Sequence, residues 1–107
     1  MTDVRDELLA EYFRFTRDVL PVRACAERWV VRYDHCFQRI ILDHLFGAPW
    51  REHLVARAPA YKQLTDEQLA RACELARRID AGGDRLLREM NRASLAWRGK
   101  IENESCS

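Results

Sequence analysis

Apolar residues recur at intervals of three and four along most of this chain, which is the period of one face of an α-helix. The pattern is longest between Pro21 and Phe46. Proline suits the first position of a helix, and Gly47 with the nearby Pro49 supplies a stop. We therefore expect one long helix over residues 21–46. Its expected inner face consists of Val22, Ala26, Trp29, Tyr33, Phe37, Ile40 and His44.

A first helix is predicted before this one, over residues 3–19. Thr2 or Asp3 is a suitable N-cap, and Asp6 and Glu7 are acidic residues in the first turn, where the helix dipole favours them. Leu20 precedes a proline, which disfavours the α conformation. We therefore expect the chain to turn at Leu20 and the first helix to pack antiparallel to the second.

The second half of the chain contains the clearest local signal. The sequence Thr65-Asp66-Glu67-Gln68 is a capping box, which predicts a helix from residue 66 to about residue 80. Gly82 and Gly83 weaken the helical pattern, and Asp84 can cap a further helix over residues 84–98. One helix bent at the glycines is the alternative. Between residues 47 and 64 we expect only a short helix, over 49–56, and an extended link.

The fold class that follows is all-α. The chain has 107 residues, which is enough for one domain and one modest core. We expect a small helical bundle of four main helices plus one short helix, with the long helix 21–46 at its centre. The predicted organisation is a single domain over residues 1–98 and a flexible C-terminal tail over residues 99–107.

Charge and hydropathy exclude some functions. Lys and Arg number 18 against 17 for Asp and Glu, so the net charge of +1 gives no strong long-range attraction to nucleic acid or to anionic membranes. No apolar run approaches the roughly 20 residues that span a bilayer. The N-terminal sequence is acidic and periodic, unlike a signal peptide. We expect a cytoplasmic protein that does not bind membranes.

No motif indicates a catalytic, metal or cofactor site. Cys25 and Cys36 are eleven residues apart, and on one helix their sulfurs would lie about 16 Å apart, too far for one ion to bind both. The adjacent pairs Asp34–His35 and Asp43–His44 point about 100° apart on a helix. Small buried hydrophobic side chains are the better interpretation of the cysteines. We therefore predict no catalytic residues, no metal and no cofactor.

The distribution of apolar residues favours an interaction protein. Apolar residues occupy more than one face of the first predicted helix, and they are consecutive at 29–31 and 40–42. Such a helix is either central to a bundle or part of an interface. We predict a small non-enzymatic interaction or regulatory protein that acts through helical surfaces, by homodimerisation or by binding a partner protein. The expected interface residues are Leu9, Phe13, Trp29, Val30 and Ile41.

Two alternative functions stay open. Arginines recur on one face of two predicted helices, where they would suit phosphate contacts of a nucleic-acid-binding regulator. These residues are Arg28, Arg32, Arg39, Arg85, Arg88 and Arg92. Acidic residues between them can form ion pairs with the same arginines. The third interpretation is a small enzyme with a pocket near residues 50–53 and 91–98.

Overall fold

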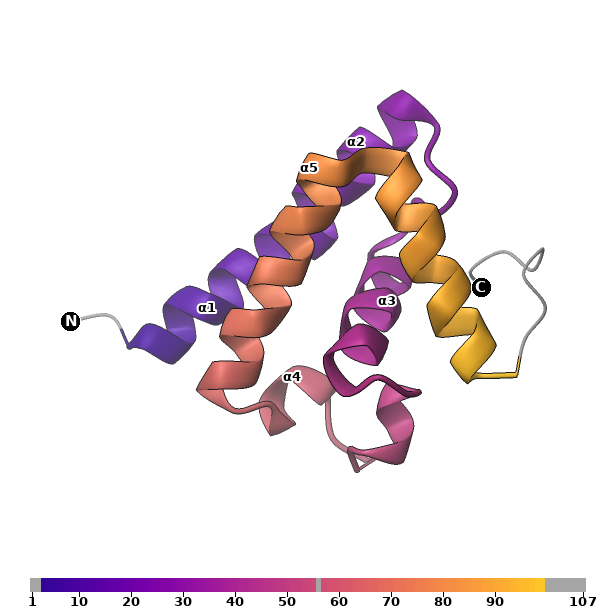
Figure 1. Ribbon diagram of the computed structural model, residues 1–107. Helices are drawn as coiled ribbons and strands as arrows, with labels where there is room; N and C mark the ends of the chain where they lie inside the picture. Colours follow the sequence, from indigo (N-terminus) through magenta and orange to yellow (C-terminus); the bar gives the residue numbers. More distant parts are fainter. Residues whose placement is uncertain (1–2, 56, 100–107) are drawn as a thin grey trace.

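The computed structural model describes residues 3–55 and 57–99, which form helices joined by short links (Figure 1). There is no β-strand in this part of the chain, so the predicted all-α bundle is confirmed. The helices in chain order are α1 (Val4–Phe13), the π-helical segment η1 (Arg14–Val19), α2 (Leu20–Glu27), α3 (Asp34–Phe46), the 3-10 turn η2 (Trp50–Glu52), α4 (Ala60–Gln63) and α5 (Asp66–Trp97).

The first three of these segments form one uninterrupted rod over residues 4–27. Leu20 has φ −70° and ψ −46°, which is regular helical geometry, so the predicted turn before Pro21 is wrong. The backbone N–H of Leu20 donates to the carbonyl of Phe15, five residues earlier. This wider π-helical turn lies directly before Pro21, which has no N–H and whose ring crowds the preceding turn of a regular helix. The helical rod therefore continues past Pro21 without a turn.

The chain leaves the helix at Arg28 instead, where φ is 56°, in the left-handed region. The following link is extended, with Trp29 and Val31 buried and Val30 and Arg32 exposed. This alternation has the period of two that an extended chain produces. The predicted helix over residues 21–46 is thus wrong, because it is two helices, α2 and α3, separated by six non-helical residues.

Part of the predicted inner face is exposed in the structure. Val22 retains 68% of its accessible surface and Tyr33 64%, and Ala26 is exposed as well. Phe37 and Ile40 are fully buried, as predicted, because both lie within α3.

Helix α5 begins with the predicted capping box. The Thr65 hydroxyl oxygen accepts the backbone N–H of Gln68 at 3.1 Å, and the Gln68 side chain accepts the backbone N–H of Thr65 at 2.8 Å. The helix bends sharply at Gly83, whose φ of 66° and ψ of −155° are not helical. Its two arms, residues 66–82 and 84–97, form an inverted V in Figure 1. The alternative prediction of one helix bent at the glycines describes this geometry.

The two arms of α5 pack on different partners. The first arm runs alongside α1, and the second arm runs alongside α3 (Figure 1). The main core lies between these elements, and its fully buried members include Leu20, Phe37, Ile40, Ile79 and Leu87. A smaller apolar cluster forms around Leu42, Leu64 and Leu69 at the end of the molecule near α4.

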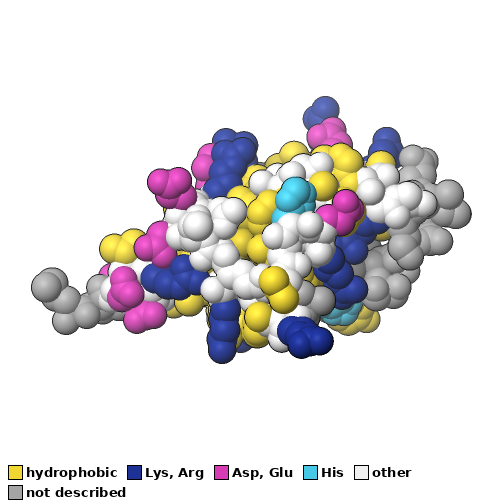
Figure 2. Space-filling model, turned by 90° about the horizontal axis from the view of Figure 1, so that it is seen from below, with side chains coloured by type: hydrophobic (Ala, Val, Ile, Leu, Met, Phe, Trp, Pro, Cys, Tyr) yellow, Lys and Arg dark blue, Asp and Glu magenta, His cyan; other side chains and the backbone are white. Residues whose placement is uncertain are grey.

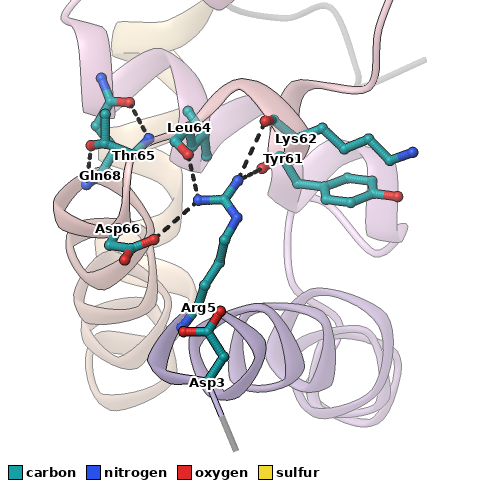
Figure 3. Close-up of polar contacts among 8 residues, drawn as sticks. All are labelled: Asp3, Arg5, Tyr61, Lys62, Leu64, Thr65, Asp66 and Gln68. Atoms are coloured by element: carbon teal, nitrogen blue, oxygen red, sulfur yellow. Dashed lines mark hydrogen bonds and ion pairs between the residues drawn. The ribbon is translucent and has the colours of Figure 1, made fainter.

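An arginine fastens the N-terminal rod to the link between α4 and α5 (Figure 3). The Arg5 guanidinium donates to the carbonyls of Leu64, Tyr61 and Lys62 at 2.8, 3.1 and 3.3 Å, and to the Asp66 carboxylate at 3.1 Å. It therefore satisfies carbonyl groups that the short helix α4 leaves without internal partners.

The region between α3 and α5 differs from the prediction in detail. The helix expected over residues 49–56 is only the 3-10 turn η2, and α4 was not predicted. The predicted flexible tail, residues 99–107, lies outside the described residues except for Gly99.

Candidate protein interface

The arginines of the predicted nucleic-acid site do not form two helical stripes. Arg28 ends α2 and Arg32 lies in the extended link, so only Arg39 belongs to α3. Arg39 is half-buried, and its guanidinium donates to the Ser94 hydroxyl and to the Asn91 side-chain carbonyl, both at 2.6 Å. The first predicted stripe is therefore wrong, because a link separates two of its members from the third.

The second predicted stripe does lie on one helix. Arg85, Arg88 and Arg92 are exposed on the second arm of α5. Arg88 forms an ion pair with Asp84, four residues earlier. Burial raises the pKa of Asp84, but the hydrogen bonds from Arg88 and from the backbone N–H of Val30 outweigh it, and the pKa falls below its ordinary value. At least one arginine of this predicted stripe thus already forms an ion pair with an acidic side chain.

A buried polar network joins α3 to the second arm of α5. Asp43 is fully buried and accepts four hydrogen bonds. They come from the Ser94 hydroxyl at 2.6 Å, from Arg98 Nε and Nη2 at 2.7 and 2.9 Å, and from the backbone N–H of Trp50 at 2.9 Å. Burial and then the charge of Arg98 lower the pKa of Arg39, while Asp43 raises it. The network thus places two guanidinium groups around one carboxylate.

This network lies where the sequence predicted an enzyme pocket. The structure does bring residues 50–53 and 91–98 together, because Trp50 and Arg98 both bind Asp43. Ser94 is fully buried, so its hydroxyl cannot meet a substrate. The polar side chains of the network bind one another, which fits a structural role in pairing the two helices.

Histidines and cysteines offer no metal site within residues 3–55 and 57–99, where no group of three or more His, Cys, Asp or Glu side chains is placed to hold an ion. His44 packs its ring edge-on against Trp97, and its Nε2 lies 2.8 Å from the carbonyl oxygen of Met90. Cys36 and Cys73 are buried, as predicted, but Cys25 is exposed.

The predicted interface residues fall into three environments. Trp29 and Ile41 are buried in the core, so this part of the prediction is wrong. Leu9 and Phe13 are partly buried, and the Phe13 ring makes a T-shaped contact with the Tyr61 ring and carries the Arg17 guanidinium over its face. Val30 is 38% exposed. Of the five residues, only Val30 presents a large apolar side chain to solvent.

The structure presents another apolar surface, on α2. Leu20 and Ala24 are fully buried on the inner side of this helix. Arg23 also turns inward, where its guanidinium binds Asp80 of α5 and Glu27, and lies 5.1 Å from the centre of the Trp29 ring.

The outer side of α2 is apolar. Its exposed residues are Val22, Cys25 and Ala26, which we call the α2 stripe. Their spacing of three and four residues places them on one face of the helix, opposite Leu20 and Ala24. Sequence reasoning missed this surface because it assigned Val22 and Ala26 to the core. The pair Leu20 and Ala24, also four residues apart, was the signal for the true inner face.

Other exposed apolar side chains are more scattered. Val4, Val55 and Trp97 lie on different elements, and single exposed hydrophobic residues are normal on protein surfaces. At the end of the molecule shown in Figure 2, hydrophobic side chains are interspersed with charged ones. The α2 stripe differs because its members adjoin along one helical face.

No helix in the described part of the chain combines the length and the hydrophobicity that crossing a membrane requires. Comparison with models of protein families, with curated proteins and with solved structures found no match.

Proposed function

We propose that this chain is a small, cytoplasmic, non-enzymatic interaction protein that associates with itself or with a partner protein through the α2 stripe. One observation carries the proposal. On α2 the Arg23 guanidinium binds Asp80 of α5 and Glu27, while Val22, Cys25 and Ala26 are exposed on one face of the helix. A surface helix normally presents charged or polar residues on its outward face.

The physical cost of this arrangement supports an interface. An apolar face left in water gives up the free energy that its burial would release, about 25 cal/mol for each Å². Cys25 and Ala26 are small, so a second helix can approach α2 closely. Val30 and Tyr33, which follow in the link after α2, are further exposed apolar or aromatic residues. Aromatic residues are enriched at protein interfaces.

The nucleic-acid alternative retains one supporting observation. Arg85, Arg88 and Arg92 are all exposed on one arm of α5. They are spaced three and four residues apart, so they share a helical face. Against it, Arg88 binds Asp84 and Arg39 is directed into the buried network.

Light scattering separates these functions. We would measure the mass of the wild type and of Val22→Glu in solution, at low and high salt, with and without duplex DNA. Val55→Glu is the matched control, because Val55 is 64% exposed but belongs to the segment between η2 and α4, which lies at the other end of the molecule from α2 (Figure 1). We expect an assembly that resists salt, ignores DNA, is lost in Val22→Glu and persists in Val55→Glu. A monomer that gains mass with DNA only at low salt would support the alternative.

A monomeric wild type that ignores DNA calls for a second measurement. A photo-crosslinking residue placed at position 22, in cells that produce the protein, should join the chain to a defined partner. The same residue at position 55 should not. Equal cross-linking at the two positions would overturn the proposed use of the α2 stripe.

A further inference from the structure

We infer that the link between α2 and α3, together with the start of the second arm of α5, binds single-stranded nucleic acid. An unpaired base stacks on Tyr33, and exposed arginines on both segments bind the neighbouring phosphates. We call this region the link surface, and its members are Arg28, Val30, Arg32, Tyr33, Arg85 and Arg88. The inference goes beyond the proposed function and does not rest on it.

One carboxylate joins the two segments of the link surface. The backbone N–H of Val30 donates to Asp84 Oδ1 at 2.8 Å, and the same carboxylate binds Arg88 Nε. The link therefore runs beside the upper part of the second arm of α5 (Figure 1). Since three residues span at most about 11 Å, Arg28 and Tyr33 both lie within that distance of Val30.

Tyr33 presents an aromatic ring to solvent. The residue is 64% exposed, and its ring stacks on that of His35, with ring centroids 5.7 Å apart and planes only 6° apart. His35 covers one side of the Tyr33 ring, so a nucleobase can extend the stack on the other side. Stacking of this kind tolerates any sequence, because every base has a π-face.

The arginines of the link surface are largely free to bind phosphate. Arg28, Arg32 and Arg85 are exposed, and none of them forms an ion pair with a residue that the structure describes. Arg32 Nε donates only to the backbone carbonyl of Trp29, at 3.5 Å. A guanidinium group binds phosphate oxygens in a bidentate manner.

Most acidic residues of the same segments already have partners. Asp84 accepts the two hydrogen bonds described above, and Asp34 accepts the backbone N–H of His35 at 2.8 Å. Glu27 forms an ion pair within α2. Glu89 is exposed on the second arm of α5, where it offsets part of the positive charge. The link surface thus keeps an excess of arginine over free carboxylate.

The backbone at Arg28 points to a task for its side chain. With φ 56°, Arg28 is the one residue other than glycine with a positive φ in the described part of the chain. Glycine is usual at this position after a helix, because a side chain is strained there. Strained residues of this kind cluster at functional sites. An arginine here fits a surface that uses its guanidinium group.

The link surface fits an unpaired strand better than a duplex or an acidic peptide. In a duplex both faces of each base are covered by its neighbours, so Tyr33 would gain no stacking partner. A carboxylate-rich peptide would bind the arginines but leave the open face of the Tyr33 ring unused. A single strand of DNA or RNA offers bases and phosphates together.

Fluorescence anisotropy with a labelled strand of about 12 thymidines tests the inference. Three phosphate contacts predict that the logarithm of the binding constant falls with the logarithm of the salt concentration with a slope of about −2. We expect a duplex of the same length to bind about tenfold more weakly, because it offers no free base. An acidic peptide of the same charge should not compete at equal concentration.

Two positions separate binding from folding. Tyr33→Ala should weaken binding about tenfold, and Tyr33→Phe should recover affinity to within about twofold, because it keeps the ring. Arg28→Gly should weaken binding about threefold and lower the salt slope by about 0.7. Its urea unfolding midpoint should not fall, because glycine suits the positive φ. The control Arg57→Ala, exposed between η2 and α4, should leave the affinity unchanged.

The outcomes are decisive in both directions. Binding that requires the Tyr33 ring and the Arg28 side chain, and that prefers the single strand, supports the inference. No binding at low salt overturns it. It is also overturned if the duplex or the acidic peptide binds equally well, or if Tyr33→Ala changes nothing. Val22→Glu tests assembly through the α2 stripe and leaves the link surface intact, so the proposed function and this inference fail separately.

Discussion

The substitution Asp43→Asn tests the buried network that joins α3 to the second arm of α5. Asn has nearly the same shape as Asp, but it carries no charge, and its amide group donates where one carboxylate oxygen accepted. Asp43 Oδ2 receives hydrogen bonds from Ser94 and from Arg98 Nε. The change therefore removes the carboxylate that Arg98 binds and whose charge also favours the charged form of Arg39.

The expected loss follows from the burial of the pair. Removing one member of a buried ion pair costs about 3–5 kcal/mol, because the other charge stays buried without compensation. Asp43 is fully buried, but the Arg98 side chain is 20% exposed, so water can solvate part of its charge. We therefore expect the free energy of unfolding to fall by about 3 kcal/mol, at the lower end of that range.

Urea unfolding followed by far-ultraviolet circular dichroism measures this loss. Glu74→Gln is the control, because Glu74 pairs with Arg78 four residues away on the exposed side of α5. Such a pair contributes only about 0.3–0.5 kcal/mol. The double variant Asp43→Asn with Arg98→Met should lose less stability than the two single losses added together. An Asp43→Asn loss no larger than that of the control would refute the energetic role of the network.

Three further predictions follow from single contacts. Arg5→Ala should lower the free energy of unfolding, measured in urea, by about 1–2 kcal/mol, because three carbonyls and Asp66 lose a charged donor. Arg5→Lys should recover only part of this loss. Full recovery would contradict the role of the planar guanidinium. Gly83→Ala should cost about 1–3 kcal/mol in the same assay, because φ 66° with ψ −155° is a glycine conformation, and an unchanged midpoint would contradict this. Burial, followed by the charge of Glu11, raises the pKa of Cys73 to about 11. At pH 8 maleimide should therefore label Cys25 quickly and Cys73 only after unfolding, as measured by peptide mass spectrometry. Equal labelling rates at the two cysteines would contradict the packing.

Local signals in the sequence were sufficient for much of the fold. The capping box at Thr65 and the special backbone of glycine at Gly47 and Gly83 act within a few residues, so they are readable without tertiary information. The start of α5 and the end of α3 follow from them directly.

The candidate site depends on contacts that sequence spacing does not reveal. Asp43 and Ser94 are 51 residues apart in the chain, and no periodicity shows that they meet. Likewise, the inward direction of Arg23 depends on Asp80, 57 residues later. Val22 and Ala26 fit the apolar period predicted for one helix over residues 21–46, which favoured the core, whereas the structure leaves both exposed.

The π-helical segment η1 explains both that error and the α2 stripe. The core-facing residues of the N-terminal rod follow one another at steps of four, as Leu8, Tyr12, Thr16, Leu20 and Ala24. In a regular helix each step of four residues rotates the side-chain direction about the helix axis by about 40°. After four such steps Ala24 would point about 160° away from Leu8. The wider turn of η1 absorbs this drift and keeps Leu20 and Ala24 against the core. The residues that a regular period of 3.6 would have buried, Val22 and Ala26, are thereby left on the outer face. The same turn admits Pro21, so the proposed interface depends on an irregularity of the helix that the sequence pattern concealed.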